Sequence, residues 1–408
     1  MRYLLLAPFL LLAACGSDGE GSAETSVAES SGGPFDANAV AEVELLMDPA
    51  DWDTLVADPH TDAWRRATLR WGGRAWPDVG VQPSGQNSRI PGNPKPSLLL
   101  NFEAFVPGRR FHGLPSLKLN WLLDDPAMMR QWLVFTIHRA RGLPAPREGY
   151  ARLSVNGGYK GLYGVTERIN REFVRARFGP GVNQLYKKTA TGEDFVWHGP
   201  DPALYVPRMF EPSIEALPPG AEDVRDLFDA LHHRSYEDIA RLFDVEAFLE
   251  FIAIEVLTGE DDGYRSGPDA LGNLWSSNFY LYKSPRNGRF RLIPWDRGES
   301  YWRPIDEPVT FTFERRVLTR RLIVERPENL ERFRRILAEL IAGPSAPEIM
   351  AGRVEHLRNL LDDHVPVEPP NPHRLWSGPQ QWTWEVDGLK REFILGRIEE
   401  IRRQLAAP

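Results

Sequence analysis

Apolar and polar positions alternate in several short segments of the first half of the chain. A period of two residues is typical of β-strands, in which successive side chains point to opposite faces of a sheet. The segments with this pattern are 39–46, 67–71, 97–102 and 116–120. Residues 49–53 have the pattern of a capped helical turn, and the Asn-Gly pair at 156–157 opens a Gly-rich hairpin pattern that ends at Glu167. We therefore expect a β-rich N-terminal part.

Helical periodicity dominates the rest of the chain. A first helix is predicted from about residue 126 to 141, where Gly142 ends it. Further helical patterns occupy 168–178, 223–232, 236–243, 245–258, 327–342, 347–364 and 384–406. The helix at 245–258 is mostly apolar and suits a core, whereas the last three are amphipathic and strongly charged. No low-complexity linker divides the chain after residue 40, so we expect one α+β unit with a helical C-terminal part.

A short hairpin is predicted within residues 279–293. Bulky residues alternate at 279–283 and again at 289–293, and Pro-Arg-Asn-Gly at 285–288 is a turn signal between them. Asn278 immediately precedes the first strand, and Asp296 follows the second strand after a Pro-Trp pair. Folding of the hairpin therefore brings Asn278 and Asp296 to the same end.

An acid, an asparagine, a short hairpin and a second acid follow one another in the order that protein kinases use. Asp262 lies just past the C-terminal end of the apolar helix and takes the place of the catalytic aspartate, with Asp261 beside it as an alternative. Asn278 and Asp296 take the places of the metal-binding residues, and their oxygens suit Mg²⁺ or Mn²⁺ shared with nucleotide phosphates. This order predicts phosphoryl transfer with ATP.

Two lysines and one loop are candidates for contact with the phosphates. The Gly/Ser-containing loop at 83–89 could cover phosphates with backbone N–H groups. Lys118 lies in a strand directly before a helix, as the phosphate-binding lysine of kinases does, and Lys95 is the alternative. The helix at 126–141 contains no glutamate, so the usual Lys–Glu ion pair must come from elsewhere or be absent. Glu167 is a candidate partner, and its position would also suit a segment beside the adenine.

Several blocks of sequence resemble the CotH kinase family, the type of spore coat protein H. These blocks are 155–167, 259–264, 277–282 and 293–296, within a region of roughly 38–305. The resemblance implies an atypical protein-kinase-like fold with a β-rich N-terminal part and a helical C-terminal part that includes 306–408. It also implies ATP-dependent, Mg²⁺- or Mn²⁺-dependent phosphorylation of Ser or Thr on a surface or exported protein.

The chain departs from the family pattern next to the second acid. Family sequences commonly carry another acid two residues after Asp296, and this chain has Gly298 followed by Glu299. One metal ligand is therefore lost or replaced by its neighbour. This departure and the missing helix glutamate keep a second class of function open, a non-catalytic surface adhesion or coat-assembly protein with the same fold. Nucleotidyl transfer onto protein is a third possibility.

The first residues predict export and lipid attachment. An apolar run at 3–12 is too short to span a bilayer and suits a signal peptide. Leu-Ala-Ala-Cys at 12–15 resembles a bacterial lipobox, in which Cys15 would carry the lipid; an incidental or buried cysteine is the alternative. Residues 16–37, rich in Gly, Ser and Glu, would form a flexible tether. We expect a lipoprotein anchored in the cell envelope, with residues 1–15 as its signal peptide.

Composition narrows the partners and the chemistry. The formal net charge is −8 with both signs interspersed, which does not favour nucleic-acid binding. Hydrophobic residues make up 42% of the chain, which is enough for a sizeable core. The chain has a single cysteine and no Gly-x-Ser-x-Gly motif, so thiol and serine-hydrolase catalysis are not expected. The expected partners are a protein substrate on the cell surface or in a coat, and a membrane through the lipid.

Overall fold

The computed structural model describes residues 32–407 except 87, 182–183, 190–191, 215–219, 268–271, 273 and 374–377. Cys15, the predicted signal peptide and most of the predicted tether lie outside the described residues. Within the described part of the chain, no helix combines the length and the apolar character needed to cross a membrane.

Seven strands close into a barrel in the order β1-β2-β3-β4-β5-β7-β6. Their bounds are β1 Val40–Met47, β2 Arg65–Trp71, β3 Arg74–Pro83, β4 Leu98–Asn101, β5 Ser116–Asn120, β6 Glu148–Val155 and β7 Gly158–Glu167. The barrel closes because β1 pairs in parallel with β6, with Val40 opposite Tyr150. Closure pairs the strand edges that would otherwise be exposed.

The alternation seen in the sequence decides which side chains fill the barrel. Leu98 and Leu100 of β4 lie opposite Leu119 and Leu117 of β5, and all four are fully buried in one apolar cluster. Lys118 stands between the two leucines of β5, so its side chain points to the opposite face of the sheet, toward the rest of the molecule. The alternation therefore places a lysine on the outer face of the barrel.

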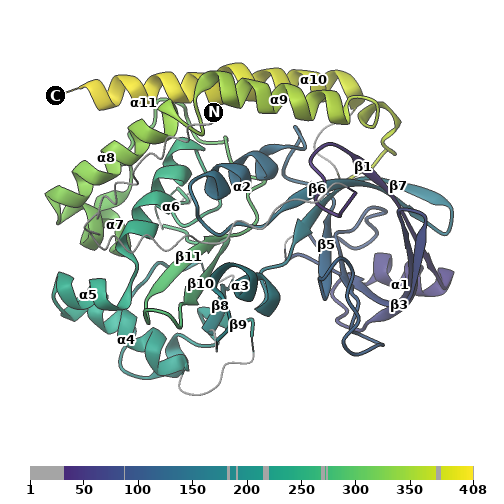
Figure 1. Cartoon of the computed structure of the whole chain (residues 1–408), viewed down its shortest axis with the longest axis horizontal. Helices are drawn as coiled ribbons and strands as arrows, with labels where there is room; N and C mark the ends of the chain where they lie inside the picture. The colour runs from purple at the N-terminus through teal and green to yellow at the C-terminus, as the bar shows by residue number, and fades with distance from the viewer. Residues whose placement is uncertain are drawn as a thin grey trace, which may run out of the picture.

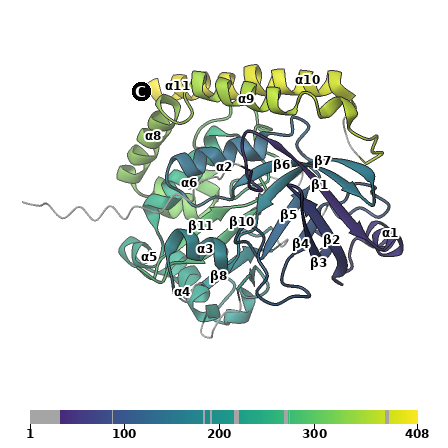
Figure 2. The same cartoon turned by 45° about the vertical axis from the view of Figure 1, so that its right-hand side comes forward.

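Two helices interrupt the strands of the barrel. Helix α1, Pro49–Ala57, begins after Asp48, whose side chain accepts a hydrogen bond from the N–H of Ala50. Helix α2, Arg130–Ala140, lies between β5 and β6, four residues later at its start than the sequence pattern predicts. Most of α2 is buried, and in the two views of Figures 1 and 2 it lies between the barrel and the helices of the second half.

A second, four-stranded sheet has the order β11-β10-β8-β9. Its strands are β8 Gln184–Lys188, β9 Phe210–Pro212, β10 Phe279–Lys283 and β11 Phe290–Pro294. The predicted hairpin is confirmed, with Phe279 opposite Pro294 and Lys283 opposite Phe290. Strands β8 and β9 were not predicted, because helical patterns dominate this region and β8 becomes a strand by pairing with β10, where Lys187 lies opposite Tyr280.

The helices of the second half follow the predicted order. They are α3 Arg171–Phe178, α4 Gly220–His233, α5 Tyr236–Leu242, α6 Val245–Leu257, α7 Val317–Thr319, α8 Pro327–Ala342, α9 Pro347–Leu361, α10 Gly378–Gly388 and α11 Gly396–Ala406, with π-helical turns at Arg320–Val324 and Leu389–Leu395. Helix α6 is buried along most of its length, as its apolar composition predicts. Mixed helix and sheet composition is thus confirmed, and the second half carries a sheet as well as helices.

The C-terminal helices extend from the helical part to the barrel. Helices α9, α10 and α11, drawn in green to yellow, run together along one side of the molecule (Figures 1 and 2). The indole N–H of Trp382 on α10 donates to the carbonyl of Ala127 at 3.2 Å, just before α2. Beyond α9, Glu368 forms a buried ion pair with Lys95 of the barrel. These contacts attach the C-terminal segment to both the barrel and α2.

Candidate active site

A cavity of about 540 Å³ opens between the outer face of the barrel and the second sheet. Its lining is mostly polar and comes from segments far apart in the sequence: the loop after β3, strand β5, the segment after β7, strand β8 and both ends of the β10–β11 hairpin. The lining includes Ser84, Gly85, Gln86, Ser88, Lys118, Asp124, Arg168, Asn170, Lys187, Asp262, Asn278, Asp296 and Glu299.

The structure brings together the three residues that carry the kinase-like order. The amide of Asn278 donates to Oδ2 of Asp262 at 2.7 Å, and the hydroxyl of Ser277 donates to Oδ1 of the same carboxylate. Asp296 follows the second strand at the same end of the hairpin, where the N–H of Trp295 donates to the carbonyl of Asn278 at 3.1 Å. The hairpin therefore holds Asn278 and Asp296 next to each other beside Asp262, and their catalytic and metal-binding roles stay predictions.

Asn278 and Asp296 share an uncommon backbone conformation. Their φ angles are 52° and 48°, in the left-handed region that side chains with a Cβ rarely adopt. Such a conformation costs on the order of 1–3 kcal/mol per residue and is concentrated at functional sites. Both residues line the cavity where the two strands of the hairpin meet it, and there the side chain of Asn278 reaches Asp262 and that of Asp296 reaches Lys118.

Of the two candidate lysines, only Lys118 lines this cavity. Its Nζ lies 3.4 Å from Oδ2 of Asp296 and 5.2 Å from the centre of the Trp295 ring. Lys95 is instead buried against the C-terminal segment, paired with Glu368 and lying over the ring of Tyr163. The loop at 83–89 does line the cavity, through Ser84, Gly85, Gln86 and Ser88, whereas Lys95 points away from it. The structure thus gives no support to a phosphate contact by Lys95.

Glu167 does not face Lys118. Its carboxylate is buried and accepts hydrogen bonds from the guanidinium groups of Arg147 at 2.9 Å and Arg177 at 2.6 Å. Burial would raise the pKa of Glu167, but the two arginines outweigh it and the pKa is lowered. Glu167 is therefore not supported as the partner of Lys118, because the two arginines already compensate the charge of Glu167. The residues that follow it, from Arg168 to Asn170, do line the cavity, and the alternative position beside the adenine stays a prediction.

Sequence reasoning missed several charged residues of the cavity. Asp124 is open to the cavity, yet loss of hydration there, together with Asp296 and Asp262, raises its pKa to about 6. Glu299, which the sequence offered as a replacement for the missing acid, also lies here, and burial, Asp262 and Asp124 raise its pKa to about 8. Lys187 of β8 has a lowered pKa because of burial and the nearby Lys118. The sequence did offer a signal for Asp124, because Asp124 and Asp125 form an acid pair between the strand of Lys118 and helix α2.

Gly298 occupies the position where the family pattern has a second acid. A Cβ at this position would lie 3.9 Å from the Cβ of Asp124. The Asp124 side chain therefore starts beside the place that the missing acid would take. Glu299, the next residue along the chain, also lines the cavity. Two carboxylates are thus available near the position at which one is absent.

The oxygen ligands of the cavity fit a metal ion that is shared with phosphates. In the described ranges, no group of three or more His, Cys, Asp or Glu side chains is placed to hold an ion by itself. Mg²⁺ is usually held by one or two carboxylates together with water and substrate phosphates. Asn278 and Asp296, with Asp124 beside them, supply hard oxygen atoms of this kind in one cavity with Lys118. The residues fit a metal–nucleotide complex rather than an all-protein metal site.

Buried ion pairs support the loop that carries Asp262. Arg297, next to Asp296, pairs with Glu255 of α6 at 2.9 Å and with Glu260 at 3.6 Å. An oxygen of Glu260 accepts the N–H of Asp262 at 3.2 Å. Arg297 therefore connects the segments that carry the two aspartates of the site.

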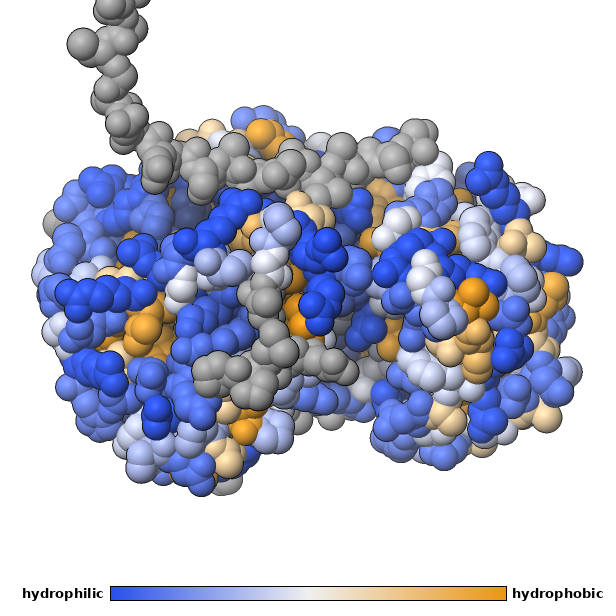
Figure 3. All heavy atoms as spheres, turned by 60° about the horizontal axis from the view of Figure 1, so that its bottom comes forward, coloured by the Kyte–Doolittle hydropathy of each residue, from blue (hydrophilic) through white to orange (hydrophobic). Residues whose placement is uncertain are grey.

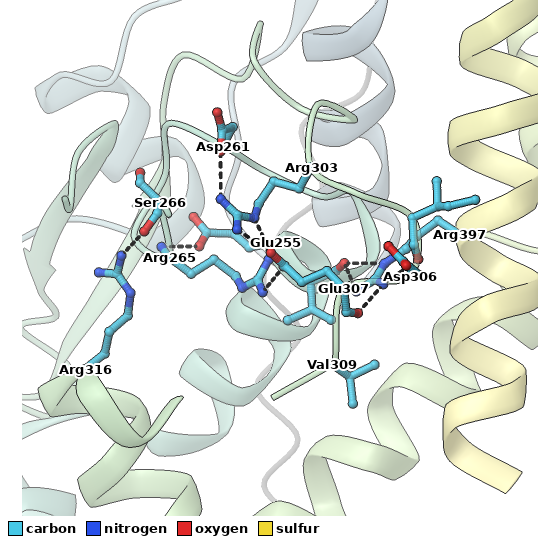
Figure 4. A network of polar contacts seen from close by, with 12 residues as sticks. Glu255, Asp261, Arg265, Ser266, Arg303, Asp306, Glu307, Val309, Arg316 and Arg397 are labelled. Atoms are coloured by element: carbon cyan, nitrogen blue, oxygen red, sulfur yellow. Dashed lines mark hydrogen bonds and ion pairs between the residues drawn. The ribbon is translucent and has the colours of Figure 1, made fainter. Parts of the chain in front are cut away.

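A neighbouring network of ion pairs and hydrogen bonds includes Asp261 (Figure 4). Asp261 pairs with Arg303 at 2.8 Å, and Arg303 and the buried Arg265 both pair with Glu307. The backbone carbonyl of Glu307 in turn accepts a hydrogen bond from Arg397 of α11 at 2.6 Å. Of the two adjacent acids, Asp262 is the one bonded to Ser277 and Asn278, so the structure favours it over Asp261.

The buried acids predict that stability falls as the pH rises. Burial raises the pKa of Glu148 on β6 to about 8 and that of Glu260 to about 7, so the folded protein holds protons that the unfolded chain releases near its ordinary value of 4.5. Stability is then lost as the pH rises toward these folded-state values. Burial lowers the pKa of His138, so this residue makes stability rise with pH, but only below about pH 6.5.

The measurement is the melting temperature between about pH 6.5 and 8. We expect it to fall over this range in the full-length protein and to fall less steeply in Glu148→Gln, because one of the acids that release a proton in this range is then absent. An equal slope in the two proteins would show that Glu148 is ionised in the folded state.

The sequence model of the CotH kinase protein family matches residues 81–399. The chain is 27% identical over 205 residues to invasin CotH2 of Rhizopus delemar, which covers 47% of this chain and 33% of that protein. It is 28% identical over 165 residues to invasin CotH3 of the same organism, covering 37% and 27%. It is 22% identical over 286 residues to inner spore coat protein H of Bacillus subtilis, covering 65% and 73%. The chain thus spans a third or less of the two invasins.

A solved structure, the proinflammatory kinase CtkA of Helicobacter pylori, aligns with 85% of this chain and 94% of its own, with 9% identity and a TM-score of 0.30. A TM-score of this size does not establish a shared fold. The family match is independent of it and includes the loop at 83–89, Lys118, the hairpin and most of the C-terminal helices. Because that match spans most of its length, the chain belongs to the CotH kinase protein family.

Proposed function

We propose that this protein is an ATP- and Mg²⁺-dependent kinase that phosphorylates serine or threonine on a surface or exported protein. The observation that carries the proposal is that Lys118, Asp262, Asn278 and Asp296 line one cavity in the arrangement that their order along the chain predicts. Membership of the CotH kinase protein family supports the same reaction class. Phosphoryl transfer needs cations at the phosphates and a carboxylate near the attacking hydroxyl, and the cavity has groups for both.

Asp262 is the proposed base. In the reaction the acceptor oxygen forms a bond to the γ-phosphorus, the bond from this phosphorus to the bridging oxygen breaks, ADP leaves, and the hydroxyl proton passes to Asp262. The hydrogen bonds from Ser277 and Asn278 orient this carboxylate. Burial and the charge of Asp296 raise the pKa of Asp262 despite the bond from Ser277, which makes it a better proton acceptor.

The remaining groups of the cavity position the nucleotide. Asn278 and Asp296 would hold Mg²⁺, and Lys118 would contact phosphate oxygens. The ion supplies neutralisation of the charge that develops on the phosphates. Arg168 and Lys187 add positive charge to the same cavity, and the loop at 83–89 offers backbone N–H groups.

A neighbouring pocket of about 490 Å³ is available for the acceptor. It shares Asp262, Asn278 and Trp295 with the cavity described above and continues past Ser266 and Trp275. An acceptor side chain that enters from this pocket would reach the carboxylate of Asp262 through a space that Lys118 does not line. This arrangement supports a protein acceptor, which can place one residue in a cleft while the rest stays outside.

A non-catalytic surface or coat-assembly protein is the second candidate. Gly298 in place of an acid and the absence of glutamate from α2 favour it, and the relatives named invasin or spore coat protein fit either function at a surface. Hydrophobic residues form small separate areas among hydrophilic ones on the face shown in Figure 3. For both candidates we propose export and attachment to the membrane through a lipid on Cys15.

The test is transfer of label from ATP by the full-length protein with Mg²⁺ or Mn²⁺, in the presence of serine-rich and basic test proteins. Transfer from γ-labelled ATP would support the kinase, and transfer from α-labelled ATP would show nucleotidyl transfer instead. The expected γ-transfer should disappear in Asp296→Ala. If neither transfer nor a nucleotide-dependent melting shift is observed, the non-catalytic surface protein is the remaining function.

A further inference from the structure

Three residues of the barrel lie in one row across its strands. Thr166 of β7 is paired with Lys118 of β5 on one side and with Glu148 of β6 on the other. Residues directly opposite each other on paired strands point to the same face. Neighbouring strands lie about 4.8 Å apart, so the backbones at Lys118 and Glu148 are separated by roughly 10 Å, which two long side chains can span. The sheet therefore places a lysine and a glutamate on one face, on either side of a small threonine.

The carboxyl group of Glu148 is buried and incompletely bonded. Its side chain is 1% exposed, and a hydrogen bond from Gln131 of α2 reaches it. In the described part of the chain, Oε2 of Glu148 receives no hydrogen bond. An unsatisfied buried polar group is costly and calls for an explanation in terms of function. Space for the group is kept by Gly164, because a Cβ there would lie 2.7 Å from Oε1 of Glu148.

Gln131 connects this glutamate to the aspartate of the site. Its Nε2 donates to the hydroxyl of Thr166 at 3.3 Å, and its Oε1 accepts the N–H of Arg297, the residue after Asp296, at 3.0 Å. Gln131 lies on α2, the helix from which a kinase glutamate would come and which here has none. The helix therefore contributes an amide to the row, and the carboxyl group comes from β6.

We propose that Glu148 is the acidic partner of Lys118 in the nucleotide-bound protein, so that the Lys–Glu ion pair of kinases is supplied here by strand β6 instead of helix α2. This inference rests on the proposed function. In the present structure Lys118 is paired with Asp296 at 3.4 Å. Asp296 is also the proposed metal ligand, and a carboxylate engaged with a divalent ion is a weaker partner for an ammonium group. Lys118, released from Asp296, favours loss of the proton that burial lets Glu148 keep in the nucleotide-free protein, and the resulting carboxylate holds Lys118 in place.

Other acidic residues near this row are less suited to pair with Lys118. Asp125 is fully buried but accepts the N–H of Arg130 at 2.7 Å and faces its guanidinium. Asp124 is open to the cavity and lies close to Asp296 and Asp262, so its charge serves the same region as theirs. Glu167 is neutralised by two arginines. Glu148 combines burial, the shared row and an unpartnered oxygen, and it acts as a positioning residue that touches neither nucleotide nor acceptor.

The test is a double-mutant cycle on affinity for ATP with Mg²⁺, measured with the full-length protein by the melting shift and by direct titration. Glu148→Gln should weaken the affinity about tenfold, the usual effect of one charge-assisted hydrogen bond. In a Lys118→Met background the same substitution should change the affinity less than about twofold, since its partner is gone. Without nucleotide, Glu148→Gln should melt at the wild-type temperature or higher. Glu42→Gln, an exposed acid of the same barrel, is the matched control and should change nothing.

A second variant keeps the test decisive if Glu148→Gln folds poorly. Gln131→Glu combined with Glu148→Gln exchanges the two groups and should restore most of the affinity, because the carboxylate is then offered from α2. An equal loss from Glu148→Gln with and without Lys118 would overturn the ion pair and leave a structural role. Wild-type affinity in Glu148→Gln would also overturn it. If the wild-type protein binds no nucleotide, the proposed function fails and the inference fails with it.

Discussion

Replacement of Asp262 by asparagine is expected to lower the rate of phosphate transfer by about 10²–10⁴-fold, the usual contribution of a positioned general base. Asparagine has nearly the same shape, and its amide oxygen can still accept one of the hydrogen bonds from Ser277 and Asn278. It cannot take the proton of the acceptor hydroxyl. The measurement is single-turnover transfer from γ-labelled ATP, with ATP affinity followed by the melting shift to show that the nucleotide still binds.

Asp261→Asn is the matched control for this experiment. Asp261 is adjacent in sequence and also acidic, but its carboxylate is paired with Arg303 and is 46% exposed. We expect its loss to change the rate less than about threefold, because an exposed pair contributes little. A large loss in Asp261→Asn together with a small loss in Asp262→Asn would reverse the assignment of the base.

Replacement of Arg297 by alanine is expected to lower the free energy of unfolding by about 3–5 kcal/mol, the usual cost of breaking a buried ion pair from one side. The guanidinium is fully buried between Glu255 and Glu260, and its removal leaves two buried carboxylates without their cation. Glu255 also accepts the N–H groups of Tyr264 and Arg265, so the loop after Asp262 loses support as well. Urea unfolding at pH 7 measures the effect.

The control is Arg402→Ala on α11. Arg402 is 46% exposed and lies 3.5 Å from Glu399, so this ion pair is open to water. We expect its loss to change the free energy of unfolding by less than about 1 kcal/mol. A loss in Arg297→Ala no greater than in the control would mean that Glu255 and Glu260 are protonated once the arginine is gone. Neutral carboxyl groups at both positions would make the arginine dispensable for folding.

The centre of the site could be predicted because it depends on a local structure. A hairpin of short strands with a Pro-Arg-Asn-Gly turn fixes which residues meet, so Asn278 and Asp296 follow from their positions at its two ends. Asp262 required one more inference, that a buried helix ends in front of the hairpin, and that helix is strongly apolar. Lys118 could be placed on the outer face of its strand by alternation alone.

The groups that sequence reasoning missed depend on pairing between distant strands. Glu148 reaches the row of Lys118 only because β7 lies between β5 and β6, an order that alternation does not reveal. Lys95 was a reasonable alternative to Lys118 until the C-terminal segment was seen to bring Glu368 against it. Lys187 lies in the cavity because β8 joins the hairpin as a strand. In each case a partner far along the chain decides the environment.

Closure of the barrel has a consequence for how the chain acquires its structure during synthesis. Strand β1 pairs with β2 soon after both are made, but its other edge has to wait for β6, since Val40 lies opposite Tyr150. Roughly a hundred residues separate the two strands, so at about 5–20 residues per second this edge stays unpaired for roughly 5–20 s. An open apolar edge invites pairing with other chains. A nascent chain of this protein is therefore most vulnerable to aggregation before β6 emerges, and a factor that shields β1 in that interval would raise the yield of folded protein.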